Sequence, residues 1–345
     1  MSVVVLKAGL LTTVQDRGRR GFAAIGVGHA GPMDAGSFRL ANALVGNADS
    51  AAALEVSLLG PRLRFETDAT IALAGARFDM RIDAQAASSW QPTRIKAGSV
   101  LDLGSAQRGA RAYLAVAGGF AVDAVLGSRS TDVNAGLGSL SGRALAAGER
   151  LSISTTASLA SDPAAAPLRG STRNIGASPS KPRRPTPSWS LDPRPWFDAV
   201  GNQPIRLIRG AHWEALDADS RVALFTQEFR IGADSNRVGY RLEGPCLALD
   251  AALELVSEAV AFGTLQLPPN GQPIALMAEH PTTGGYPRIG QIAAIDLPRL
   301  AQRRPGDYIR FLEMGIDEAQ TRYLAREREL AHLLDVIATR IATHD

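Results

Sequence analysis

Short apolar runs separated by glycine-rich turns constrain the fold of this chain more than any other feature. They recur about every ten residues through positions 1–155 and again through 204–312. Examples are VVVL at positions 3–6 and IALM at 274–277. Runs this short, bounded by turn residues, are typical of antiparallel β-sandwiches and barrels. The pattern therefore predicts a mainly β protein with two β-rich regions.

The segment between the two β-rich regions differs in composition. Positions 156–203 are dominated by Ala, Ser, Pro and Arg, and they include eight prolines. Proline removes a backbone donor and fixes φ, so repeated proline prevents both helices and sheet pairing. We interpret the segment as a Pro/Ala/Ser-rich linker, which limited proteolysis should cut first. Trp189 and Trp196 are predicted to attach its end to a neighbouring domain.

Two helices are predicted from apolar spacing. In the first, at positions 34–44, four apolar residues recur close to the helical period, and the Gly46-Asn47 pair ends it. The second, at 317–342, begins with Asp317 as its cap and carries a near-heptad apolar stripe. This stripe either packs on its own domain, which is the simpler interpretation, or contacts a partner protein. It is formed by Tyr323, Leu330, Leu334, Ile337 and Ile341.

Composition and charge exclude several classes of protein. A chain of 345 residues with 45% hydrophobic residues is long enough for two cores. Its net charge is +3, and its densest basic cluster, at 181–184, lies in the predicted linker, so no nucleic-acid surface is predicted. No apolar run approaches the length of a membrane span, so no membrane association is predicted.

Cysteine and histidine usage narrows the chemistry further. Cys246 is the only cysteine, which rules out an internal disulfide and a cysteine-based metal site. We expect it to be a small buried side chain and not a nucleophile. The five histidines show no metal-ligand spacing, so no metal site is predicted. With no signal-peptide cleavage site after the first apolar run, a cytoplasmic location is favoured.

Familiar catalytic signatures are absent from the sequence, which contains no Walker loop, HExxH motif or GxSxG elbow. The densest group of functional residue types is AEHPTTGGYPRIG at positions 278–290. Two hydroxyls, two glycines that permit close approach, an aromatic and a proline follow one another there. The segment is either a rim that binds a ligand or a well-formed hairpin loop.

Two arginine-bearing loops add further candidates. Gln15, Asp16 and Arg17 follow a predicted strand, and Asn236 and Arg237 stand in a similar place in the second β-rich region. The planar fork of arginine suits carboxylate, carbamate or phosphate groups, and neighbouring amides can orient a small polar amide. Each residue taken alone is also compatible with an ordinary surface loop.

Two acidic residues have competing interpretations. Glu258, in the sequence SEA, is the best candidate for a general acid or base, and an exposed strand-end charge is the alternative. Asp34 follows His29 and the sequence AGPM, just before the first predicted helix. We interpret Asp34 as the N-cap of that helix and not as a catalytic residue.

Eight sequence pieces in order resemble the allophanate hydrolase subunit 2 family, also called the biotin-dependent carboxyltransferase family. Together they extend over most of the chain, which makes the resemblance specific although each piece is short. They are LLTTVQDRG at 10–18, GPMD at 31–34, LANALVGN at 40–47, ALEVSLLGP at 53–61, LGSRST at 126–131, SNRVGYRLEGP at 235–245, SEAVAFGTLQLPPNGQP at 257–273 and TTGGYPRIG at 282–290.

The resemblance implies two cyclophilin-like β-barrel domains that pair face to face. Combined with the composition, it places an N-terminal barrel at 1–155, the linker at 156–203, a C-terminal barrel at 204–315 and a C-terminal helix at 316–345. The chain departs from the family pattern at Asn236, where the commoner residue is Asp. It also departs at Glu279-His280-Pro281, where Asp-Arg-Gln is frequent.

The resemblance also implies a function. It indicates the C subunit of an ATP-dependent 5-oxoprolinase, which opens 5-oxoproline to L-glutamate with a KipI-like partner (the B subunit) and a LamB/YcsF-like partner (the A subunit). ATP would be bound with or by a partner. One alternative is a carboxyltransferase module that moves a carboxyl group from carboxybiotin to urea or a related amide, with biotin carried elsewhere because the chain has no Met-Lys pair. Another is a KipA-like regulator that binds a KipI-like kinase inhibitor.

We predict a site in the groove between the two barrels. Arg237→Lys should then weaken transition-state or ligand binding by about 1–3 kcal/mol, because lysine cannot reproduce a bidentate fork. The fold should be unaffected if Arg237 is exposed, and Arg183→Lys in the linker is the control. The predicted catalytic residues are Glu258 and Arg237, and the predicted substrate-binding residues are Gln15, Arg17, Asn236, Thr282, Thr283, Gly284, Gly285 and Tyr286.

Overall fold

The computed structural model describes residues 1–154, 189–197 and 203–344. Most of the predicted linker at 156–203 therefore lies outside the described residues. The prediction that limited proteolysis cuts there first concerns those residues and stays a prediction. Of its described part, α4 (Arg194–Phe197) is a single helical turn, and the N–H of Leu191 donates to the carbonyl of Trp90 at 2.8 Å. Trp189 and Trp196 are both partly buried.

The chain forms two compact units that do not follow the sequence order. The first comprises Met1–Gly18, Ala35–Trp196 and Ala331–Asp345, and the second comprises Arg19–Asp34 and Phe197–Leu330. A short N-terminal segment, with the 3₁₀ turn η1 (Ala23–Ile25), therefore belongs to the second unit. The structural units thus differ from a simple division of the chain into an N-terminal and a C-terminal half.

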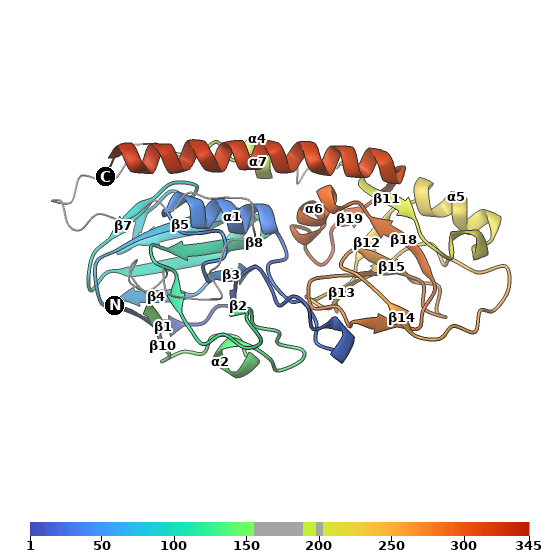
Figure 1. Ribbon diagram of the computed structural model, residues 1–345, viewed down its shortest axis with the longest axis horizontal. Coiled ribbons are helices and arrows are strands. Elements are labelled where there is room, and N and C mark those ends of the chain that lie inside the picture. Colours follow the sequence, from blue (N-terminus) through green and yellow to red (C-terminus); the bar gives the residue numbers. More distant parts are fainter. Residues whose placement is uncertain (155–188, 198–202, 345) are drawn as a thin grey trace. The chain divides into compact units, whose positions relative to one another are not determined.

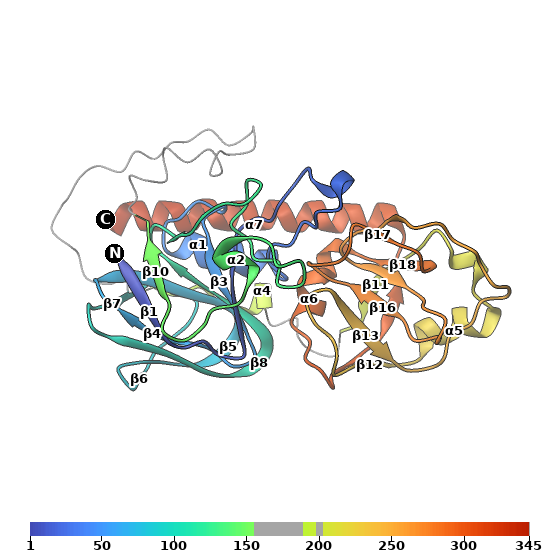
Figure 2. The ribbon, with the colours of Figure 1, turned by 90° about the horizontal axis from the view of Figure 1, so that it is seen from below.

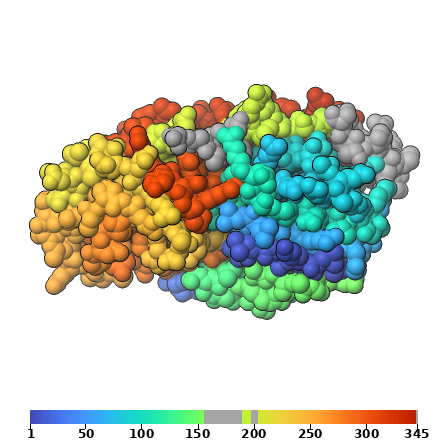
Figure 3. Space-filling view, turned by 180° about the vertical axis from the view of Figure 1, so that it is seen from behind, coloured from blue at the N-terminus to red at the C-terminus, as the bar shows by residue number. Residues whose placement is uncertain are grey.

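The first unit is built on one large antiparallel sheet (Figure 1). In β4 alternate residues bury one face of the strand: Leu63 and Phe65 are buried, and Arg62 and Arg64 are exposed. Figure 3 shows the dark blue first residues between light blue and green ones, as pairing of β1 with β4 and β10 requires. The main strand order is β2 (Leu11–Gln15), β3 (Ala53–Ser57), β8 (Val100–Val116), β4 (Arg62–Phe65), β1 (Ser2–Lys7), β10 (Arg150–Ile153) and β9 (Phe120–Ala121).

A long hairpin and a helix complete the first unit. Strand β5 (Ala69–Ile82) pairs with β8 and also with the short strands β6 (Gln85–Ala86) and β7 (Thr93–Ile95). Helix α1 (Ala35–Leu44) packs on this sheet, with the ring of Phe38 edge-on to Tyr113 at 5.9 Å between centroids. The first predicted helix is thereby confirmed. The helical turn α2 (Ser139–Gly142) lies in the loop before β10.

The second unit is a sheet that nearly closes on itself (Figure 2). Its two end strands, β19 and β20, are joined by a single residue, Arg310, so the two ends of the sheet are neighbours along the chain. All its pairings are antiparallel except β11 with β20. The order is β19 (Tyr308–Ile309), β12 (Phe229–Ile231), β13 (Gly239–Glu243), β16 (Ile274–Leu276), β15 (Thr264–Gln266), β18 (Arg288–Ile292), β11 (Ile205–Arg209) and β20 (Phe311–Glu313).

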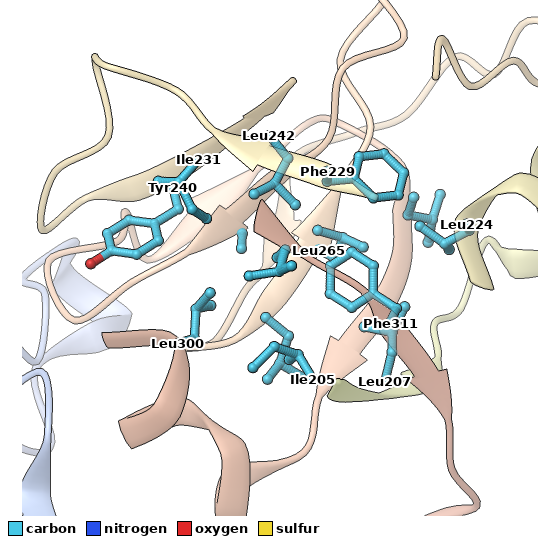
Figure 4. Close-up of a cluster of buried hydrophobic side chains, with 14 of the residues drawn as sticks. Ile205, Leu207, Leu224, Phe229, Ile231, Tyr240, Leu242, Leu265, Leu300 and Phe311 are labelled. Atoms are coloured by element: carbon cyan, nitrogen blue, oxygen red, sulfur yellow. The ribbon is translucent and has the colours of Figure 1, made fainter. Parts of the chain in front are cut away.

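Aliphatic and aromatic side chains fill the interior of this barrel (Figure 4). Phe229 and Phe311 pack with ring centroids 5.8 Å apart. Tyr240 keeps its ring in the cluster, while its hydroxyl donates to the carbonyl of Ala301 at 3.4 Å and so avoids an unpaired buried group. Besides η1, helical segments of the unit include η4 (Trp213–Ala215), α5 (Ala218–Thr226), η5 (Ala294–Asp296) and α6 (Leu297–Ala301).

The last helix, α7 (Ile316–His344), confirms the second predicted helix but not its predicted cap. The helix begins one residue before Asp317, and the N–H of Ala319 donates to the carbonyl of Gly315. Asp317 therefore lies inside the first turn. Leu330 and Ile337 are buried, which confirms packing on the chain itself, whereas Tyr323 of the same stripe is 41% exposed. Among the described residues, no helix combines the length and hydropathy required to cross a membrane.

Candidate functional site

The glycine-rich segment at 278–290 contributes a short strand as well as a loop. Strand β17 (Thr283–Gly284) pairs with β14 (Glu258–Ala259) in a separate two-stranded sheet of the second unit. This pairing brings Glu258 opposite Gly284, although 25 residues separate them in the sequence. The hairpin-loop interpretation is wrong, because the flanking strands β16 and β18 each pair with β15 and not with each other. Thr283, Gly285 and Tyr286 are exposed, so the segment forms a rim that could bind a ligand.

Glu258 lies on the outer side of this rim. Its carboxylate pairs with the guanidinium of Arg288, and the two side chains are 52% and 28% exposed. Arg288 also donates to the carbonyl of Ala259 at 3.2 Å, so one arginine holds both residues of β14. An exposed ion pair of this kind contributes little to stability, so Glu258 can exchange partners at low cost. Tyr286 is exposed on the same segment.

Arg237 is buried, which the sequence pattern did not indicate. Only 3% of its side chain is exposed, and its Nε donates to the carboxylate of Glu279 at 2.5 Å. Its Nη2 donates to the carbonyl of Gly31 at 2.6 Å. The expectation that Arg237→Lys would spare the fold assumed an exposed side chain, and that condition is not met. Asn236 accepts a hydrogen bond from the N–H of Val238 at 2.8 Å, which closes the turn.

The GPMD motif anchors the segment Arg19–Asp34 within the second unit. Met33 is 1% exposed and belongs to the core of that unit. The carboxylate of Asp34 accepts a hydrogen bond from Nε2 of Gln302 at 2.8 Å. The carbonyl of Gly31 also accepts a hydrogen bond from Arg237. Three of the four motif residues, Gly31, Met33 and Asp34, therefore make contacts within the second unit. Asp34 also directly precedes α1, so its predicted capping role remains a prediction.

In the first unit, the carboxylate of Asp16 organises the turn after β2. It accepts hydrogen bonds from the hydroxyls of Ser128 at 2.6 Å and Ser130 at 2.7 Å. It also accepts from the backbone N–H groups of Arg129 at 2.6 Å and Gly18 at 2.9 Å. Four donors on one buried carboxylate explain why the QDRG and LGSRST pieces occur together in this chain.

The two residues beside Asp16 differ sharply from each other. Gln15 is fully buried, and its Nε2 donates to Thr13 at 3.0 Å and to the carbonyl of Thr131 at 2.9 Å. Its Oε1 is buried without a hydrogen-bond partner. Arg17 is one-third exposed and pairs with Asp49 at 2.9 Å. Gln15 and Arg17 belong to the first unit and the other predicted site residues to the second, so the shared groove stays a prediction.

Protonation of His280, on the segment that leads into the rim, should lower the stability of the folded chain in acid. Burial lowers the pKa of His280 from its ordinary value near 6.5, and a hydrogen bond to the carbonyl of Pro281 opposes the shift only partly. The unfolded chain therefore takes up a proton before the folded one, so stability falls as pH drops from about 6.5 through the folded pKa. We expect the melting temperature of His280→Gln to fall less between pH 7 and pH 5 than that of the unmodified chain.

The matched control for His280→Gln is His332→Gln on the exposed side of α7. That variant should retain the full acid-induced fall in melting temperature. Identical pH profiles for the unmodified chain and His280→Gln would show that His280 titrates alike in the folded and unfolded states, against the expectation.

Two features correct or limit the sequence expectations. Cys246 is exposed and not buried, because the apolar residue that enters the core at this point is its neighbour Leu247. The pattern also did not single out Gln266, a lone polar residue between Leu265 and Leu267 at the end of strand β15, which is 4% exposed. A polar residue inside an otherwise apolar stretch was the available signal. Within the described ranges, no group of three or more His, Cys, Asp or Glu side chains could hold a metal ion.

The class of protein follows from the fold together with a sequence match. The carboxyltransferase domain family, subdomains A and B, matches residues 25–313. The match extends over both β-rich units, so the chain belongs to this family. The resemblance inferred from the eight sequence pieces is thereby confirmed, as is the mainly β fold of two barrel-like units with a C-terminal helix.

Within the family, the chain is similar to two 5-oxoprolinase C subunits and to a urea amidolyase of known structure. The chain is 38% identical to the 5-oxoprolinase C subunit of Escherichia coli K12 over 315 residues, covering 91% of this chain and 92% of that protein. It is 34% identical to the 5-oxoprolinase C subunit of Haemophilus influenzae over 318 residues, covering 92% of each chain. The crystal structure of the K. lactis urea amidolyase superposes with a TM-score of 0.80 at 28% identity, covering 95% of this chain but 20% of the amidolyase.

Proposed function

We propose that the chain is the C subunit of an ATP-dependent 5-oxoprolinase, which opens 5-oxoproline to L-glutamate together with partner proteins. The observation that carries the proposal is the 38% identity to a 5-oxoprolinase C subunit over nearly the full length of both chains. Similarity over 91% of this chain and 92% of that subunit favours the same role in a complex more than a shared domain does. A cytoplasmic location is part of the proposal.

The chemistry of the reaction explains why partners would be required. A lactam carbon is a poor electrophile, and phosphorylation of the amide oxygen by ATP makes it reactive to water. The sequence holds no nucleotide-binding motif that would perform this step alone. We therefore propose that the enzyme is completed by a KipI-like partner and a LamB/YcsF-like partner and that ATP binds with or on one of them.

Within this chain we propose Glu258 as a proton-transfer group at the rim formed by β14 and β17. Its carboxylate is exposed and bound by a solvent-accessible guanidinium, so substrate can reach it. Arg237 would act through Glu279 and Gly31, because its hydrogen bonds to these two residues lie in the interior. The proposed substrate contacts are Gln15, Arg17, Asn236, Thr282, Thr283, Gly284, Gly285 and Tyr286.

Co-expression with the two partners tests this proposal. A stable complex should appear on size exclusion, and ATP hydrolysis should increase on addition of 5-oxoproline. The purified chain alone should show no increase in ATP hydrolysis on addition of 5-oxoproline. Hydrolysis by the isolated chain at the rate of the complete mixture would contradict the requirement for partners.

A carboxyltransferase activity is the second candidate, and the match to the K. lactis urea amidolyase favours it. In that case the chain would move a carboxyl group from carboxybiotin to urea or a related amide. The biotin would arrive on another protein, since the chain has no Met-Lys pair. Carboxylation of urea by this chain in the presence of a carboxybiotin carrier would support the second candidate over the first.

A further inference from the structure

An unpaired amide lies beneath the two-stranded sheet formed by β14 and β17. Gln266, the last residue of β15, is 4% exposed, and its Nε2 is buried without a hydrogen-bond partner. Removing an amide donor from water without a partner is unfavourable, and such groups are uncommon in folded proteins. Position 266 therefore holds a buried amide nitrogen that contributes no hydrogen bond to the closed structure.

The β14–β17 sheet closes over this amide only because residue 284 is glycine. A Cβ atom built on Gly284 would lie 2.4 Å from Nε2 of Gln266 and 3.4 Å from its Cδ. The same Cβ would also lie 3.4 Å from Cγ1 of Val260. The amide therefore occupies the space where a side chain of β17 would otherwise be, and β17 covers it directly.

A guanidinium lies beside the amide on the same face of the sheet. Gln266 and Arg288 are register partners in the antiparallel pairing of β15 with β18, next to a register shift that skips Ile289, and cross-strand partners project to one side. In the closed β14–β17 sheet, Arg288 is occupied by Glu258 and by the carbonyl of Ala259, both on β14. One movement of β14 and β17 would therefore uncover Gln266 and release Arg288 together.

The β14–β17 sheet is held weakly enough to move. Its ladder contains two residue pairs, Glu258 with Gly284 and Ala259 with Thr283, and one adjoining hydrogen bond from Val260 to Thr282 at 3.2 Å. A two-stranded sheet is marginally stable by itself. Its ion pair to Arg288 is solvent-exposed and contributes little.

We propose that Gln266 and Arg288 form a binding subsite for a small molecule that carries both a carbonyl oxygen and a carboxylate, and that the two-stranded β14–β17 sheet is its lid. Nε2 of Gln266 donates to the carbonyl oxygen, and the guanidinium of Arg288 binds the carboxylate. 5-Oxoproline carries both groups, so this subsite rests on the proposed function and specifies it further. Opening the lid also frees the carboxylate of Glu258 beside the bound molecule.

Gln266→Met in the complete complex tests the subsite. Methionine is flexible and of similar length, so it fills the space while removing both polar atoms. We expect KM for 5-oxoproline to rise about tenfold, the loss of one hydrogen bond to a bound ligand. We also expect an unchanged or higher melting temperature, because an unpaired buried donor is removed. The matched control is Gln85→Met on the exposed strand β6, which should change neither KM nor the melting temperature.

Hydrogen exchange provides a readout that does not depend on turnover. Adding 5-oxoproline to the complex should change exchange of the amides at 258–260 and 282–284, and Gln266→Met should abolish that change. Gly284→Ala should speed exchange there without ligand, because the β14–β17 sheet cannot close over Gln266. If Gln266→Met left KM unchanged and lowered the melting temperature, the amide would have a structural role only, and the proposal of a binding subsite would be overturned. A complex without 5-oxoprolinase activity that still shows the ligand-dependent exchange would refute the proposed function alone.

Discussion

Replacing Arg237 by alanine is expected to lower the free energy of unfolding by about 3–5 kcal/mol, the range for removing one partner of a buried ion pair. The carboxylate of Glu279, which is 2% exposed, would lose its guanidinium, and the carbonyl of Gly31 would lose its donor. Urea unfolding of the purified chain, followed by circular dichroism, measures the change. The effect should also appear as faster proteolysis within Arg19–Asp34, the segment that Arg237 holds.

Two further variants separate the ion pair from general damage to the fold. Arg310→Ala removes one partner of the exposed pair with Glu228, where the side chains are 63% and 45% exposed, and should cost less than about 1 kcal/mol. Replacing Arg237 and Glu279 together by methionine should cost less than Arg237→Ala, because no buried charge is left unpaired. A loss as small as that of Arg310→Ala would show that the pair is not the anchor described above.

The second large effect is expected at Asp16. Asp16→Asn keeps the shape of the side chain but replaces one acceptor oxygen by a donor that faces hydroxyl and N–H groups. We expect the free energy of unfolding to fall by about 3 kcal/mol, since hydrogen bonds to a charged group are lost and a buried donor is left unpaired. Thermal and urea unfolding of the variant measure this directly.

Asp49→Asn is the matched control for Asp16→Asn. It makes the same chemical change in the same unit, but Asp49 pairs with Arg17 where both side chains are about one-third exposed. An exposed pair of this type is worth at most about 1 kcal/mol. Equal losses for the two variants would mean that the four donors around Asp16 contribute no more than a surface ion pair.

The elements that depend on local patterning could be predicted from the sequence. The apolar run at 3–6 became β1, and the two stretches with helical spacing became α1 and α7. Binary patterns record which face of an element is buried, so they can be read without knowledge of what packs against it. The exact start of α7 could not be predicted, because the boundary depends on a backbone bond to Gly315.

The arrangement of the site could not be predicted, because its contacts join distant parts of the chain. Arg237 reaches Gly31 across 206 positions, and Gln302 reaches Asp34 across 268. The family resemblance marked Arg237 as important but carried no information on its burial. Gln266 escaped notice for a related reason, since only the pairing of β14 with β17 shows what covers it.

Conversion of isotope-labelled 5-oxoproline by the reconstituted complex tests the central claim most directly. The complete mixture contains this chain, the KipI-like and LamB/YcsF-like partners and ATP. It is compared with the mixture lacking this chain, and labelled glutamate is followed by NMR. We predict that glutamate forms only in the complete mixture and in step with ATP hydrolysis. Glutamate formation at the same rate without this chain, or none in the complete mixture, would contradict its assignment to a 5-oxoprolinase.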